Sequence, residues 1–186
     1  MMDDILTQLT PEQALKVVRR LYERDVDIRQ AVMEEANSVL EAVDRDETAE
    51  EVLFVLDSID VQDLWDNSGA KRSGYISPDE AAVEMMEDEL EPFFDQVRRY
   101  HKLKMFPQAK VYCMGVLQGI YRFVQESKSE FKGWAVDIPI ERFGYLLDEW
   151  RKNCQGSTAT TEMDEFIRNS CPNWAKYVFR DNDRTT

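Results

Sequence analysis

The sequence predicts an all-α fold, an irregular array of about seven to nine antiparallel helices arranged as helical hairpins, in a solenoid-like series or an orthogonal bundle. Three observations favour this class: apolar residues recur at the 3.6-residue helical period, helix-capping patterns precede several of these segments, and no segment alternates apolar and polar residues as a strand does. Of the 186 residues, 43% are hydrophobic and 11% aromatic, which is enough apolar surface for a core that needs neither a metal nor a disulfide.

The first two helices are predicted to form an antiparallel hairpin. Thr10, Pro11 and Gln13 have the spacing of a capping box with proline at the first helical position, so a helix should begin there. Its apolar stripe follows the helical period, and a second stripe continues after Asp25 and Asp27.

A third helix is predicted to begin at Thr48, because Thr48 and Glu51 repeat the capping-box spacing. One more helical turn is expected from Asp60 to Trp65. Residues 66–76 are rich in the residue types that turns require, and this segment is predicted to be a loop.

The strongest capping pattern of the chain is at Ser77, which is followed by Pro78 and by two acids that face the positive end of the helix dipole. Pro92 interrupts the helix that begins there. Because proline removes a backbone donor and clashes with the preceding turn, the helix is predicted to kink or to restart near Glu91.

Residues 107–127 are predicted to form the central helix. Apolar or small residues cover nearly its whole circumference, which is typical of a helix that is buried on most sides. Gly115 and Gly119 lie one turn apart and let a neighbouring backbone approach closely. The polar exceptions share a single stripe, formed by Gln118, Arg122 and Gln125.

The C-terminal part is predicted to continue as helices. Residues 138–139 should open a helix that ends near Cys154, and residues 157–161 should form a linker. Two short helices and a polar tail follow. We therefore expect a helical-repeat-like domain over residues 1–156, and a C-terminal segment, residues 157–186, whose short helices pack on it.

The formal net charge is −14, and this charge is unevenly distributed. Residues 34–95 contain 20 acids and 3 bases, whereas residues 96–132 contain 2 acids and 8 bases. The two regions can neutralise each other within the fold, or each can meet a partner. Overall negative charge disfavours nucleic acid as a partner, because the phosphate backbone is negative as well, and it favours a protein or peptide partner that is basic.

The sequence favours a cytoplasmic protein with no membrane partner. No segment approaches the roughly 18 consecutive apolar residues of a membrane-spanning helix. Near the start of the chain, Asp3 and Asp4 occupy positions at which a secretory signal carries Lys or Arg. The sequence does not indicate an oligomeric state.

Four segments resemble a helical region of uncharacterised prokaryotic proteins: Ile59–Gly69, Gly74–Ala82, Leu90–Phe93 and Gly119–Phe123. The resemblance covers Pro11 to about Phe123. In some members this region accompanies a SWIM-type zinc finger, and its helices are similar to those of tetratricopeptide or HEAT-type scaffolds. The resemblance implies a helical interaction module without a known catalytic residue. Because this chain lacks the Cys and His ligand set of the zinc finger, no metal site carries over.

Six residues are candidates for binding a ligand or partner: Trp65, Lys71, Arg72, Tyr75, Gln118 and Arg122. Trp65 immediately precedes the predicted loop and Lys71, Arg72 and Tyr75 lie in it, so that aromatic rings and cations there could bind a peptide carboxylate or a small anion. Alternatively, the loop binds no ligand and only covers an aromatic side chain that packs beneath it. On the central helix, Arg122 is expected to pair with a carboxylate or a carbonyl, because an unpaired buried charge is strongly unfavourable.

Clustered carboxylates support an alternative hypothesis. Five acids lie three or four residues apart on one predicted helix: Glu80, Glu84, Glu87, Asp88 and Glu91. Di-iron bundles use Glu-x-x-His, and none of these acids has that partner; the single imidazole, His101, is elsewhere. The sequence thus favours a non-catalytic protein-interaction or scaffold module. The alternative is a small-molecule or metal-binding helical bundle, including a hydrolase that uses these carboxylates. No catalytic residue, metal ligand or cofactor is predicted.

Overall fold

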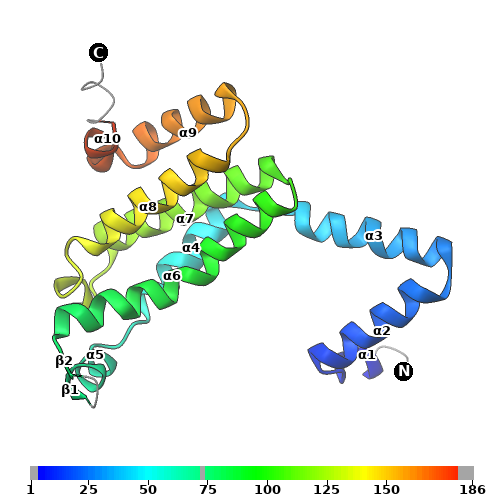
Figure 1. Cartoon of the computed structure of the whole chain (residues 1–186), viewed down its shortest axis with the longest axis horizontal. Helices are drawn as coiled ribbons and strands as arrows, with labels where there is room; N and C mark the ends of the chain where they lie inside the picture. Colours follow the sequence, from blue (N-terminus) through cyan, green and yellow to red (C-terminus); the bar gives the residue numbers. More distant parts are fainter. Residues whose placement is uncertain (1–3, 72–73, 180–186) are drawn as a thin grey trace. The chain divides into compact units, whose positions relative to one another are not determined.

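A computed structural model describes residues 4–71 and 74–179 and confirms the all-α fold (Figure 1). Its elements, in chain order, are α1 (Asp4–Thr7), α2 (Pro11–Arg24), α3 (Val26–Glu41), α4 (Arg45–Asp57), α5 (Val61–Asn67), β1 (Gly69–Lys71), β2 (Gly74–Ile76), α6 (Pro78–Lys102), α7 (Phe106–Glu126), the 3₁₀ helix η1 (Glu130–Gly133), α8 (Ile138–Asn153), α9 (Ser157–Ser170) and α10 (Pro172–Val178). No helix within these described ranges is long and apolar enough to cross a membrane.

The chain divides into two compact units, one ending at Ala42 and the other beginning at Val43. The boundary that the sequence suggests between residues 156 and 157 lies inside the second unit. There, α9 packs on α7, and the Trp174 ring of α10 packs edge-on against Tyr121 and Phe143, with centroid separations of 5.2 and 5.1 Å. The C-terminal helices therefore share the core of the second unit.

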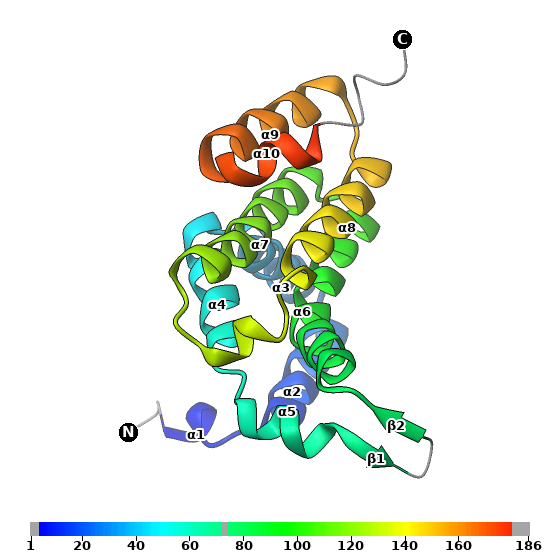
Figure 2. The ribbon, with the colours of Figure 1, turned by 90° about the vertical axis from the view of Figure 1, so that its left-hand side faces the viewer.

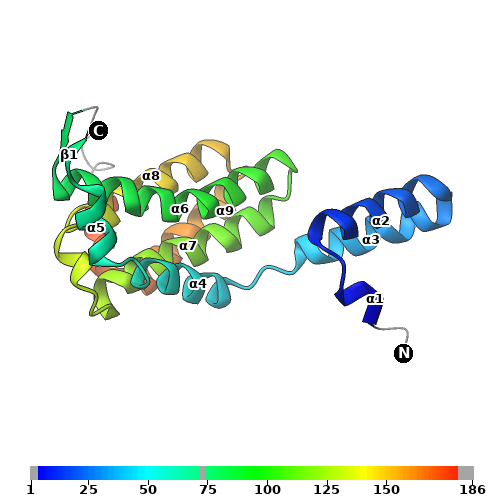
Figure 3. The same cartoon turned by 90° about the horizontal axis from the view of Figure 1, so that it is seen from below.

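The first unit consists of α1 and the α2–α3 hairpin (Figure 3). The capping box that the sequence predicts at Thr10 is present: Thr10 N donates to Gln13 Oε1 at 3.0 Å, and Gln13 N donates to Thr10 Oγ1 at 3.3 Å. Asp25 caps α3 by accepting from Asp27 N at 2.7 Å. None of the residues in α2 or α3 is buried.

In the second unit α7 is the central helix, as the sequence predicts (Figure 2). It packs against α4, α6, α8 and α9, and nine of its 21 residues are buried. The two glycines bring α4 very close: a Cβ at Gly115 would lie 2.6 Å from Thr48 Cβ, and one at Gly119 would lie 2.6 Å from Val52 Cβ. Only a residue without a Cβ fits either position.

The start of α4 differs from the prediction. The helix begins at Arg45, because Asp44 accepts hydrogen bonds from Asp46 N at 2.8 Å and Glu47 N at 2.9 Å. The Thr48 hydroxyl, predicted to be the cap, lies inside the helix and donates to Asp44 O. A carboxylate one turn upstream thus takes the capping role.

The segment predicted as a loop, residues 66–76, instead contains a small antiparallel hairpin. Strand β1 pairs with β2 in the register Gly69 with Ile76 and Ala70 with Tyr75. Gly69 has φ +92°, a conformation that side chains rarely adopt. Three-residue strands are too short to show an alternating pattern, so the sequence displayed only the turn-forming residues.

Two further boundaries are corrections. Of the two outcomes predicted at Pro92, a kink or a restart near Glu91, the restart does not occur, because helix α6 runs unbroken from Pro78 to Lys102. Pro92 is exposed, and water can satisfy the carbonyl that loses its donor there. Residues 157–161 do not form a linker; they make the first turns of α9, which follows directly after Gly156 at φ +93°.

Candidate functional site

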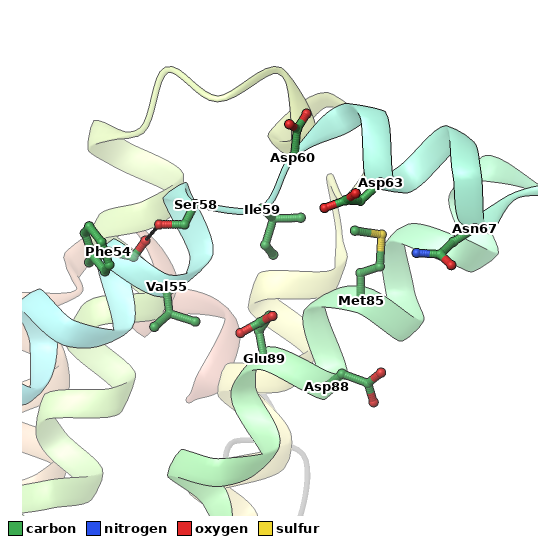
Figure 4. Close-up of a pocket in the computed structure, with 10 residues that line it drawn as sticks. All are labelled: Phe54, Val55, Ser58, Ile59, Asp60, Asp63, Asn67, Met85, Asp88 and Glu89. Carbon is green, nitrogen blue, oxygen red and sulfur yellow. Dashed lines mark hydrogen bonds between the residues drawn. The ribbon is translucent and has the colours of Figure 1, made fainter.

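A pocket of about 360 Å³ opens in the second unit between α4, α5 and α6 (Figure 4). Its lining combines acidic, apolar and small polar side chains: Phe54, Val55, Ser58, Ile59, Asp60, Asp63, Asn67, Met85, Asp88 and Glu89. None of the ten is a base. We call this space the acidic pocket.

Four carboxylates line the acidic pocket, and helix geometry sets their positions. Asp60 is the N-cap of α5 and accepts from Gln62 N at 2.8 Å, and Asp63 follows in the first turn. Asp88 and Glu89 are consecutive on α6. In Figure 4 the side chains of Asp63 and Glu89 are directed toward Ile59, whereas those of Asp60 and Asp88 point outward. Asp63 and Glu89 are therefore the acids best placed to meet a ligand.

The floor of the acidic pocket is apolar. Ile59 is buried, and Val55 and Met85 are partly buried against the core. At one edge the Phe54 ring is 71% exposed. A surface that combines an apolar floor with carboxylates suits a Lys or Arg side chain, since such side chains have an apolar stem and a cationic head.

Some acids of the region 34–95 are neutralised by ion pairs within the fold. Arg122 pairs with Glu50 at 2.7 Å, and Arg142 pairs with Glu87 at 2.6 Å. Arg98 binds Glu91 together with Asp95 and Glu149. Among the described residues, by contrast, no base forms an ion pair with any of the four carboxylates in the acidic pocket. The negative charge of the acidic pocket is therefore not neutralised by an ion pair within the described part of the chain.

Near the β1–β2 hairpin, the structure describes the side chains of two of the four predicted site residues, Trp65 and Tyr75. The Trp65 ring packs edge-on against Trp134 with centroids 5.1 Å apart, and Trp65 is 47% exposed. Tyr75 is 72% exposed on β2. The side chain of Lys71 and the whole of Arg72 lie outside the described residues.

The other two predicted site residues lie on the α7 surface that faces α4. Arg122 Nη1 donates to Glu50 at 2.7 Å, and its Nε donates to Glu126 at 2.9 Å, so the predicted carboxylate partner is present. The hydrogen bonds to Glu126 and Glu50 raise the pKa of Arg122. Gln118 Oε1 is buried and has no hydrogen-bond partner in the described part of the chain. Neither residue lines the acidic pocket.

Burial shifts the pKa values of two cysteines and of the single histidine. Burial raises the pKa of the Cys113 thiol, so it is protonated at neutral pH and is a poor nucleophile. Burial also raises the pKa of Cys171 to about 12 and lowers the pKa of His101.

The clustered acids of α6 do not assemble into a ligand set. Glu80 closes the capping box of Ser77, while Glu87 and Glu91 bind arginines. No group of three or more His, Cys, Asp or Glu side chains in the described ranges could hold a metal ion.

The sequence predicts Asp60 as a helix cap and Asp88 as part of an acidic helix face, but no local pattern joins the two residues into one pocket. The sequence feature that points toward an acidic pocket is the excess of acids over residues 34–95. That excess does not say which helices meet, and the pocket depends on the contact between α5 and α6.

Comparison with known proteins gives no match: no family model matches the chain, and neither does a curated protein or a solved structure. The resemblance to prokaryotic tetratricopeptide-like or HEAT-like proteins therefore stays a prediction.

Proposed function

We propose that this protein is a non-catalytic interaction module that binds a basic segment of a partner protein in the acidic pocket. One observation supports this most strongly: four carboxylates line a pocket with an apolar floor and no paired base among the described residues. We also propose that the protein is cytoplasmic and is a scaffold of helical-repeat type, as its sequence favours.

Arginine is the preferred occupant. Its planar guanidinium can donate to two carboxylates at once, and Asp63 and Glu89 are both directed toward the space above Ile59 (Figure 4). Its methylene groups can lie on Ile59 and Met85, which replaces water on an apolar surface. The volume of about 360 Å³ is near the lower limit of small-molecule sites, so it suits one or two side chains of a peptide.

The exposed ring of Phe54 gives the pocket an apolar rim. Aromatic side chains are enriched among residues that dominate protein interfaces, because they bury a large area with little loss of rotamer entropy. A basic segment with a neighbouring apolar residue would therefore contact both the carboxylates and this ring.

Fluorescence anisotropy with a labelled peptide that contains three arginines tests the proposal. The peptide should bind, and its analogue with neutral citrulline in place of arginine should not. The double variant Asp63→Asn/Glu89→Gln should weaken binding about tenfold or more, because two charge-assisted hydrogen bonds are lost.

The matched control is Asp79→Asn/Glu84→Gln, which removes the same charge from exposed positions of α6 outside the pocket. This control should change the affinity less than about twofold at physiological salt, where screening weakens distant charges. Equal weakening by both double variants would mean that only the overall negative charge attracts the peptide, and it would contradict a defined site.

A further inference from the structure

The α2–α3 hairpin exposes an apolar face on both helices. On α2 five large apolar side chains are between 37% and 50% exposed: Leu15, Val17, Val18, Leu21 and Tyr22. On α3 Val26, Met33 and Val39 are between 47% and 73% exposed. The helices touch each other, yet no residue of either is buried. In Figure 1 the two helices diverge from their connection.

Such a hairpin has little stability of its own. Helices of 14 and 16 residues are marginal in water unless an amphipathic face packs on something. Units of about 40 residues usually need a disulfide, a metal or association with another chain. The first unit ends at Ala42, and the three cysteines of the chain are all in the second unit. No disulfide is available to this unit, and no metal-binding group occurs among its described residues, so packing of its apolar face against another surface would stabilise it.

The charges of the two helices are opposite. Helix α2 has four bases and two acids, a net charge of +2, whereas α3 has one base and four acids, a net charge of −3. A face built from one basic and one acidic helix is complementary to itself after a twofold rotation, since the basic helix of one copy then meets the acidic helix of the other. A partner with charge of one sign would match only one of the two helices.

We propose that the α2–α3 face binds a second copy of this chain, so that two hairpins form a four-helix cluster in which α2 of each copy packs against α3 of the other. Apolar side chains of both copies fill the centre, as in other helix bundles assembled from pairs of hairpins. Helices of like charge lie diagonally opposite, and helices of unlike charge are neighbours. This pairing is independent of the acidic pocket, which lies entirely in the second unit.

Sedimentation velocity of the full chain, at about 1 to 100 μM protein, tests the proposal. The expected species has twice the 21.8 kDa mass of the chain. A monomer at every concentration would overturn the inference.

Two variants at consecutive positions on α3 show whether this face is responsible. Val39→Asp places a charge on the apolar face and should weaken dimerisation about tenfold or more, because the carboxylate would be buried without a partner. Ser38→Asp adds the same side chain on the polar side and should leave the dimer unchanged. Both positions are exposed in the single chain, so both variants should keep the wild-type helical circular dichroism. Equal effects of the two substitutions would contradict the proposed face.

A charge-exchange experiment tests which helices pair. Arg24→Glu reverses a charge beside the apolar face of α2, one turn after Leu21, and Glu35→Lys reverses a charge beside that of α3, one turn before Val39. Each variant alone should dimerise more weakly than the wild type, whereas an equimolar mixture should form a heterodimer, since the acid introduced on α2 then meets the base introduced on α3. A mixture that forms no heterodimer would overturn the pairing of α2 with α3.

Discussion

Replacing Gly119 with alanine should destabilise the second unit, although alanine is the better helix former. The added Cβ would lie 2.6 Å from Val52 Cβ and 2.8 Å from the carbonyl oxygen of Ala49. Both atoms belong to α4, and neither is the flexible end of a side chain. Helix α4 must therefore move away from α7 by most of an ångström to restore van der Waals distance.

The magnitude follows from two opposing contributions. Alanine gains about 1 kcal/mol over glycine from helix propensity. Overpacking of a close contact costs about 1 to 3 kcal/mol, and here the cost falls at or above the upper end, because a backbone carbonyl and a β-branched side chain must both move. Displacing α4 also loosens Val52 and Leu56, which are fully buried. We expect a net loss of about 2 kcal/mol in the free energy of unfolding.

Gly144→Ala on α8 is the matched control. No heavy atom lies within 4 Å of the Cβ it would add, so only the propensity gain applies and the variant should be about 1 kcal/mol more stable than the wild type. Urea unfolding followed by tryptophan fluorescence measures both variants, and it reports on the second unit alone because all four tryptophans lie there. If Gly119→Ala is stabilised as much as Gly144→Ala, the close α4–α7 contact is refuted.

Three other measurements test further details. Asp44→Ala should cost about 1 kcal/mol in urea unfolding, because two backbone donors of α4 lose their acceptor; no change would contradict the corrected helix start. Iodoacetamide at neutral pH should label only the partly exposed Cys154, as mass spectrometry can show, because Cys113 and Cys171 are buried; labelling of all three without denaturant would contradict that burial. The hydrogen bond from Arg122 lowers the pKa of Glu126 below its ordinary value of 4.5, so this pair stabilises the fold above pH 4.5 and its contribution is lost as the pH falls through the lowered pKa. Acid unfolding of Arg122→Gln should consequently be less steep below pH 4.5 than that of the wild type, and identical profiles would show that the pair has no role.

Local patterns in the sequence predicted the features that depend on a few adjacent residues. The capping boxes at Thr10 and Ser77, and the buried central helix with its two glycines, follow from residue type and spacing, and the structure has all of them. The predicted N-cap of α4 is wrong: Thr48 lies inside the helix, and Asp44, four residues earlier, is the N-cap. Both residue types are common N-caps, so residue type alone does not decide between them.

The acidic pocket could not be predicted, because its two pairs of acids are about 25 residues apart in the sequence and meet only when α5 packs on α6. The same holds for pairs that neutralise charge, such as Arg122 with Glu50. The sequence gives the total charge of a region, whereas packing decides which acids keep no partner. Trp65 also makes a contact that no local pattern indicates. Its side chain is exposed, yet its ring packs on Trp134.

Nuclear magnetic resonance most directly tests whether the acidic pocket binds a basic segment. The isotope-labelled protein is titrated with the arginine peptide and, separately, with its citrulline analogue. The largest chemical-shift changes should occur at Ile59, Asp63, Met85 and Glu89, and only with arginine. Changes spread evenly over the acids of residues 34–95, or centred on Trp65 instead, would contradict binding in this pocket.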